Sequence, residues 1–156
     1  MILDERLEFG DALVVTGAAA PAALIGDVID LGEDGLDVGL GEEVFFVITT
    51  DTEVITGGNA GSTQFDLVSD STANLATSPT THFSTGAIVT DDAAVNDSRL
   101  NAGGVICAVR LPVGTYERYL GLLQTITTTE ITAGKINAFL TKDFSKWYSL
   151  ANAVGA

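Results

Sequence analysis

Thr63-Gln64-Phe65-Asp66-Leu67 alternates polar and apolar side chains, as a strand with one buried face does. Two apolar runs of strand length lie on either side of it. Val44-Phe45-Phe46-Val47-Ile48 comes before, and Val105-Ile106-Cys107-Ala108-Val109 comes after, where we expect a central strand with two packed faces. The chain between them is rich in Thr, Val and Ile, residue types that favour strands. The sequence therefore predicts short β-strands.

Turn clusters rich in Gly, Asn and Asp separate about eight candidate strands. These are residues 13–16, 24–31, 43–50, 63–69, 81–90, 105–111, 116–127 and 135–141. In the last of them, Ile136, Ala138 and Leu140 should share one face. Residues 92–100 fit a short helix or a loop. Such closely spaced short strands are typical of one β-sandwich or barrel, so we predict an all-β fold with a single domain at 14–141.

The 156 residues carry a formal net charge of −14. This charge argues against binding DNA or RNA phosphates and against an anionic membrane surface. Residues 1–98 hold 18 acidic residues and one basic residue, whereas residues 99–156 hold six basic and three acidic. Such asymmetry can mark an interaction polarity. We favour the simpler interpretation, in which strands from both halves interleave in one sandwich.

Catalytic motifs are few. His82 is the only histidine and lies in a predicted strand, and no serine has the surroundings of a nucleophile elbow. Cys107 is the only cysteine, so an intrachain disulfide is excluded, and its apolar neighbours predict a buried, unreactive thiol. We expect no enzyme activity and no cofactor.

An acidic loop at residues 30–37 invites a calcium interpretation, because Ca²⁺ prefers oxygen ligands at alternating loop positions. Its spacing does not follow the EF-hand pattern. We therefore favour a solvated acidic turn and expect no metal site.

Both ends of the chain are candidate interface segments. The N-terminal arm, residues 1–13, intersperses acidic residues among apolar ones that include Leu3, Leu7 and Phe9. The C-terminal tail, residues 142–156, carries Phe144, Lys146, Trp147 and Tyr148, together with Lys142. Aromatic residues are enriched in interface cores, so the tail is predicted to dock on another subunit, with its lysines facing acidic groups. The alternative is that these aromatic residues cap the chain's own sandwich.

The start of the chain lacks the features of a signal peptide, and no apolar run is long enough to span a bilayer. We expect synthesis in the cytoplasm of the producing cell.

Short sequence patches along the chain resemble a family of tailed-phage capsid cement (head-decoration) proteins. They are Met1-Ile2-Leu3-Asp4 with Phe9, Asp11 and Ala12; Ile29-Asp30-Leu31-Gly32; Asp37-Val38-Gly39-Leu40-Gly41-Glu42 with the following apolar run; Ser78-Pro79-Thr80; Arg118-Tyr119-Leu120; and Ala133-Gly134-Lys135-Ile136-Asn137-Ala138-Phe139-Leu140. The patches occur in the order and with the spacing of the family, and together they extend over residues 1–140. The chain departs from the family pattern in its acidic first half, an insertion-like segment at 85–100 and a longer tail.

The resemblance implies a jelly-roll-like fold, no catalysis, and a location on the outer surface of a virion capsid, where the protein would bridge neighbouring major capsid subunits. Arg118, in a matching patch, joins Leu3, Leu7, Phe9 and the four tail residues as a candidate interface residue. We expect self-association, with a homodimer favoured over a trimer because two-fold closure is the commonest symmetry.

Two other classes of function remain open. A carbohydrate-binding or adhesin β-sandwich would use exposed aromatic residues, for which Trp147 and Tyr148 are the candidates. A small hydrolase on a jelly roll is disfavoured by the single histidine.

Overall fold

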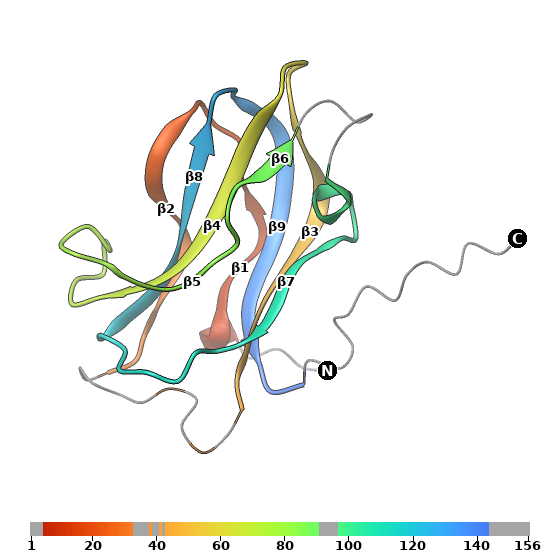
Figure 1. Cartoon of the computed structure of the whole chain (residues 1–156). Coiled ribbons are helices and arrows are strands. Elements are labelled where there is room, and N and C mark those ends of the chain that lie inside the picture. The colour runs from red at the N-terminus through yellow and green to blue at the C-terminus, as the bar shows by residue number, and fades with distance from the viewer. Residues whose placement is uncertain (1–4, 33–37, 39–40, 42, 91–96, 144–156) are drawn as a thin grey trace, which may run out of the picture.

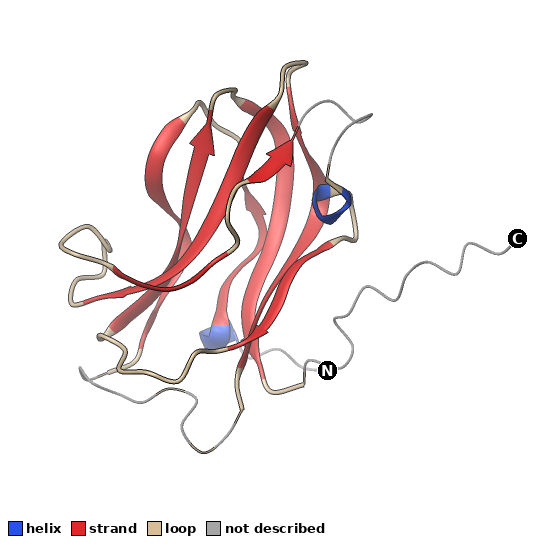
Figure 2. Cartoon of the chain, viewed as in Figure 1, coloured by secondary structure: helices blue, strands red, loops and turns tan. Residues whose placement is uncertain are grey.

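The computed structural model describes residues 5–32, 38, 41, 43–90 and 97–143, and this part of the chain is almost entirely β-structure (Figure 1, Figure 2). Its strands are β1 (Glu8–Val14), β2 (Ala20–Asp30), β3 (Phe45–Thr56), β4 (Gly61–Asp70), β5 (Thr80–Ser84), β6 (Ile88–Thr90), β7 (Val105–Arg110), β8 (Tyr119–Thr127) and β9 (Ile131–Thr141). Two single-turn 3-10 helices, η1 (Glu5–Leu7) and η2 (Ser98–Leu100), accompany them. Within these described ranges, no helix has the length and apolar character needed to cross a membrane.

The strands form two antiparallel sheets that pack face to face. Sheet A has the order β1-β9-β3-β7, and sheet B has the order β2-β8-β4-β5, with β6 also paired to β4. The chain changes sheet at every connection except those joining β4, β5 and β6. This strand order and alternation are those of a jelly roll. The predicted all-β, jelly-roll-like sandwich is therefore confirmed, with nine strands in the described part.

The ninth strand arises because the candidate strand at 81–90 is interrupted. β5 pairs with the second half of β4, and β6 pairs with its first half. Between them, the backbone N–H of Thr85 donates to the carbonyl oxygen of Phe65 (3.0 Å), and the Thr85 hydroxyl accepts from the Phe65 N–H (3.0 Å). The interruption is thus tied to β4 by one residue.

The two halves of the sequence interleave, as the simpler interpretation of the charge asymmetry predicts. In sheet A, β9 lies between β1 and β3, and in sheet B, β8 lies between β2 and β4. Each strand from the basic second half therefore has neighbours from the acidic first half.

β7 corrects the expectation of a central strand at Val105–Val109. β7 lies at the edge of sheet A and pairs with β3 alone. Its residues are apolar because Ile106 belongs to the core while Cys107 and Val109 pack against the margin of the core. An apolar run therefore does not require a strand on each side.

The predicted N-terminal arm is also corrected from Glu5 onward, since residues 1–4 lie outside the described residues. β1 pairs with β9, so the sandwich begins at Glu8 rather than at residue 14. The Phe9 ring is fully buried and meets the Phe46 ring edge to face at 5.7 Å between centroids. Of the predicted tail, residues 142–156, only Lys142 and Asp143 belong to the described part, where they directly follow β9.

The hydrophobic core fills the space between the sheets. β9 contributes Ile136, Ala138 and Leu140, which confirms the predicted face of that strand. β9 begins at Ile131, four residues earlier than the predicted core strand. From sheet B, Phe65 and Leu122 face the same core.

At one side of the sandwich, β1 and β2 approach each other closely. A Cβ atom on Gly26 would lie 2.2 Å from the carbonyl oxygen of Phe9, and Gly26 has a φ of +70°. Only glycine fits this position, for both steric and conformational reasons. Gly26 therefore lets the edge strand of sheet B close against the edge strand of sheet A.

Replacing Ala138 with Asp should lower the free energy of unfolding by roughly 3–5 kcal/mol, because an unpaired charge would enter the core. Ala138 is 0% exposed. Urea denaturation of the purified variants measures the change. Thr132→Asp is the matched control, because it adds the same charge at an exposed position of β9. Equal stability of the two variants would contradict the assigned face.

Candidate interaction surface

The β2 strand exposes most of its length at the free edge of sheet B. The chain from Ala12 to Gly26 contains no charged residue, although residues 1–98 as a whole carry a net charge of −17. Proteins usually protect long exposed edges with charged side chains, because unpaired backbone groups invite association with other chains. Here Pro21 and the bend at Gly26 limit strand pairing, but the side-chain surface of the edge remains uncharged.

A groove of about 300 Å³ opens at this edge, between β2 and the segment that connects it to β1. We call it the β2 groove. Its lining is mainly apolar and consists of Thr16, Gly17, Ala18, Ala20, Pro21, Ala23, Ile25, Gln124 and Ile126. Its volume lies at the lower limit of small-molecule sites, so it suits a single aromatic or aliphatic group.

Gln124 supplies the buried polar group of the β2 groove. Its side-chain amide nitrogen donates to the carbonyl oxygen of Val15 and to the hydroxyl of Thr63, both at 3.1 Å. These two bonds use both amide protons and fix the orientation of the amide. Gln124 is 6% exposed, and its Oε1 accepts no hydrogen bond from any described residue. Gln124 thus ties this wall of the groove to the chain after β1 and to β4.

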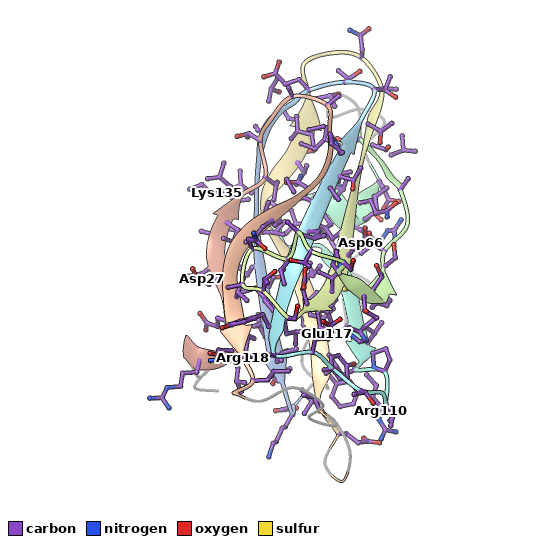
Figure 3. All side chains as sticks on the ribbon, turned by 90° about the vertical axis from the view of Figure 1, so that its left-hand side faces the viewer. Asp27, Asp66, Arg110, Glu117, Arg118 and Lys135 are labelled. Atoms are coloured by element: carbon purple, nitrogen blue, oxygen red, sulfur yellow. The ribbon has the colours of Figure 1, made fainter. Side chains whose placement is uncertain are left out.

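Four of the six basic residues in the described part lie at one end of the sandwich, which we call the terminal end. Arg110 and Thr141 both pair with Phe45 there, so Lys142 is nearby, and Arg6 precedes β1, whose Glu8 pairs with Phe139. Arg118 lies at the start of β8 at the same end (Figure 3). The β2 groove extends to the opposite end, since its lining residue Gly17 bridges to Ile131 at the start of β9.

The residues predicted to form an interface do not share one surface in the structure. Phe9 is a core residue and not a surface residue, because the sandwich itself covers it. Leu7 is 39% exposed on η1. Arg118 forms a two-bond ion pair with Asp30 (3.0 and 2.9 Å) and lies over the Tyr119 ring at 5.0 Å. Leu3, Phe144, Lys146, Trp147 and Tyr148 lie outside the described residues.

The loop between β4 and β5 folds over the outer face of sheet B. Leu75 is 3% exposed and packs with Val68 and Leu123 in a small second cluster. The Asp70 carboxylate accepts backbone N–H bonds from Thr72, Thr77 and Ser78 within this loop. Burial raises the pKa of Asp70, but these bonds and that of the Ser71 hydroxyl together outweigh it and lower the pKa. The loop is therefore a fixed part of the surface.

His82 and Ser69 form the only contact that resembles a nucleophile–base pair in the described structure. His82 Nε2 lies 2.7 Å from Ser69 Oγ, and the His82 ring stacks on Tyr116. Ser69 is fully buried, and its Oγ accepts the N–H of Glu117. This geometry gives no approach for an external carbonyl group. The pair instead ties β4, β5 and the chain before β8 together.

Cys107 and the acidic loop at 30–37 were the other candidates for a reactive or metal-binding site. Burial raises the pKa of the Cys107 thiol to about 12, so the thiolate is absent near neutral pH. In the acidic loop at 30–37, Asp30 pairs with Arg118 and accepts the Gly32 N–H, and residues 33–37 lie outside the described residues. No group of three potential metal ligands occurs in the part that the structure describes.

Sequence reasoning did not select the β2 edge or Gln124. The available signal was the 15-residue charge-free run from Ala12 to Gly26 within the acidic half. Gln124 gave no signal, because a single Gln in a strand is indistinguishable from a solvent-facing residue until the opposite sheet is placed.

A model of the Bbp16 protein family matches residues 9–140. The chain therefore belongs to the Bbp16 family. This is a phage-type family, and the match indicates a phage structural protein. No curated protein matches the chain.

Replacing Gly121 with Ala should loosen the loop between β4 and β5. The added Cβ would lie 2.4 Å from the Cδ1 atom of Leu75, so Leu75 must move out of its cluster. We expect the variant to lose roughly 1–3 kcal/mol of stability and to be cleaved faster in the loop by a protease. Gly114→Ala, which adds a methyl group into open space, is the control. Equal cleavage of both variants would contradict this packing.

His82 should make stability depend on pH below about 6.5. Burial lowers its pKa, and the nearby Glu117 carboxylate opposes that effect. As the pH falls through 6.5, the unfolded chain binds a proton that the folded chain does not, so unfolding becomes more favourable. His82→Gln should remove this loss of stability between pH 7 and 5, measured as the denaturation midpoint at each pH. If the His82→Gln variant kept the pH profile of the wild type, His82 would not be the cause of the lost stability. The lowered carboxylate pKa values of Asp30, Asp70 and Asp97 act only at more acidic pH.

Proposed function

We propose that this member of the Bbp16 family is a capsid cement protein, which binds the outside of a tailed-phage head and bridges neighbouring major capsid subunits. The observation that carries the proposal is the family match over residues 9–140, which is of phage type. The patches that resemble cement proteins lie within or beside the same range. The protein would be made in the host cytoplasm and act on the virion surface, without a cofactor.

The architecture suits a mechanical role. A jelly roll packs its side chains at the density of an organic crystal, so it resists deformation when its surface is pulled. Phe46 contacts the rings of both Phe9 and Phe83 edge to face, at 5.7 and 6.1 Å between centroids, and so joins β1, β3 and β5 through the core. Contacts made on either sheet would therefore be held at a fixed separation.

The charge of the chain supports a protein partner rather than a nucleic acid or a membrane. Its net charge of −14 repels polyanions and keeps the protein soluble before assembly. In this proposal the chain has no catalytic role, and the buried Ser69–His82 pair serves stability. Self-association, with two-fold symmetry preferred, is part of the same proposal.

A carbohydrate-binding role is the second candidate. Within the described part, Tyr119 is a partly exposed aromatic residue, and the Arg118 guanidinium already covers its ring. The described surface thus favours the cement role, and the tail residues Trp147 and Tyr148 are left to the experiment.

Phage heads assembled without this protein provide the test. The purified chain should co-sediment with them at a fixed, saturable stoichiometry and raise the temperature at which the shells break. Bovine serum albumin of matched concentration is the control for trapping. Absence of saturable binding, together with specific binding on a glycan array, would replace the cement proposal with the carbohydrate-binding one.

A further inference from the structure

His82 lies where β4, β5 and the chain before β8 meet. Its Nε2 atom is 2.7 Å from Ser69 Oγ of β4, and its ring stacks on the Tyr116 ring at 3.9 Å between centroids. Ser69 Oγ also accepts the backbone N–H of Glu117 at 3.1 Å. Tyr116 and Glu117 belong to residues 111–118, which we call the β7–β8 connection. The Ser69–His82 contact therefore holds this connection on β4 and β5.

The hydrogen bonds of Ser69 determine which form of His82 fits the site. A hydroxyl group has one proton to donate and two lone pairs that accept. One lone pair of Ser69 Oγ accepts the Glu117 N–H, and among the described residues His82 Nε2 is the only group placed to accept the Ser69 proton. Ser69 is 0% exposed, so bulk water does not replace that acceptor. Nε2 must therefore carry a lone pair, and the neutral ring carries its proton on Nδ1.

Protonation of His82 removes this match. The imidazolium has an N–H at both ring nitrogens, so the Nε2–H would point at Ser69 Oγ. Oγ would then accept two N–H bonds, and the buried hydroxyl proton would have no acceptor among the described residues. An unsatisfied buried donor costs free energy. Acid therefore favours a state in which the protonated ring has left this contact.

We propose that Ser69, His82 and Tyr116 form an acid-sensitive latch, which opens when His82 gains a proton and releases the β7–β8 connection while the core of the sandwich stays folded. The latch acts independently of the cement role and of self-association. It accounts for more than the pH dependence of global stability, because it confines the acid response to one segment and one hydrogen bond.

The elements that meet at the latch are less covered than the centre of the sandwich. β5 is a five-residue strand at the edge of sheet B, and none of its residues is fully buried. The β7–β8 connection contains no strand and crosses from sheet A to sheet B at the terminal end (Figure 1). β3, in contrast, pairs on both sides and carries Phe46 into the core. Edge segments of this kind open at a lower free energy than central strands.

The β7–β8 connection brings one carboxylate and one phenol to His82. Burial lowers the pKa of His82, and the Glu117 carboxylate opposes this effect to a smaller extent. Burial raises the pKa of Tyr116 to about 12, so the phenol stays neutral. The next residue, Arg118, is paired with Asp30. His82 is therefore the group of the latch that changes charge in mild acid.

The two strands at the latch add only carboxylates. β5 has no ionisable residue besides His82. In β4, Asp66 accepts from the Gln64 side-chain amide. Burial raises the pKa of Asp70, but the N–H bonds from the following loop outweigh burial and lower it, so Asp70 stays ionised. Because the closed latch has the lower His82 pKa, the open state binds the proton more readily, and its population rises as the pH falls through 6.5.

Hydrogen exchange of the whole chain, followed by NMR, tests the latch. The reporter is the Glu117 N–H, which Ser69 Oγ holds. Between pH 7.5 and 5, its protection factor should fall by up to about 30-fold, the limit for an open state in which His82 has the ordinary pKa of 6.5. The reference is the set of amides at 46–48 in β3, which pairs with both β7 and β9.

Urea separates local opening from global unfolding. Opening of the latch exposes little surface, so exchange of the Glu117 N–H should not change up to about 1 M urea. The amides at 46–48 should exchange more slowly than Glu117 at each pH, and their exchange should accelerate with urea because it requires global unfolding.

His82→Gln and Thr81→Gln are the matched variants. Gln at position 82 does not titrate, and its side-chain oxygen can accept the Ser69 proton, so the protection of Glu117 should be the same at pH 7.5 and 5. Thr81 is the exposed neighbour of His82 on β5, and its variant should keep the wild-type response. Near-UV circular dichroism at pH 7.5 establishes that both variants are folded.

A second measurement needs no variant. His82 is the only histidine, so the ¹⁵N signals of its ring are assigned without ambiguity. At pH 7.5 they report which ring nitrogen carries the proton, and the latch requires Nδ1.

Three results would contradict the latch. The first is a neutral ring with its proton on Nε2. The second is protection of Glu117 that does not fall in acid, or that falls equally in His82→Gln. The third is exchange of Glu117 that follows urea as the β3 amides do, which would make the acid response global unfolding.

Discussion

The packing of Phe46 between the two sheets is the contact on which the rest of the structure depends. Its fully buried ring meets Phe9 from β1 and Phe83 from β5, so one residue of β3 connects both sheets with both edges of the sandwich. Around these rings, β9 lies between β1 and β3 and β8 lies between β2 and β4, so strands of the acidic half flank both. Truncating Phe46 would leave a cavity between the sheets and remove buried apolar surface that stabilises the fold.

The same packing leaves an opening at the β1–β2 side. Gly26 brings β2 against the carbonyl oxygen of Phe9, but past that point the connection between the strands diverges and the β2 groove forms. Gln124 belongs to the inner face of sheet B, where its amide protons hold Val15 and Thr63. The polar group at this edge is therefore held by the closure of the core, through one bond to the chain after β1 and one to β4.

Interleaving also changes the meaning of the charge asymmetry. In the sequence the basic residues follow the acidic ones, but in the fold the two sets share both sheets. What the fold creates instead is a terminal end that gathers Arg6, Arg110, Arg118 and Lys142, opposite the end where the groove opens. The protein thus combines an uncharged edge at β2 with a surface whose net negative charge repels other polyanions.

The sequence by itself determined most of the strands, because alternation such as Thr63–Leu67 and the turn clusters depend only on neighbours along the chain, although it joined β5 to β6 and assigned most of β1 to an arm. It placed Ile136, Ala138 and Leu140 on one face for the same reason. It could not determine that Val105–Val109 forms an edge strand, that Phe9 is a core residue, or that Gln124 lines a groove, because each depends on which distant strand lies alongside. The alternation of polar and apolar residues predicts whether a side chain is buried, but it does not predict which strand buries it. Only the tertiary structure decided that, through the sheet order that brings β1 beside β9 and β2 beside β8.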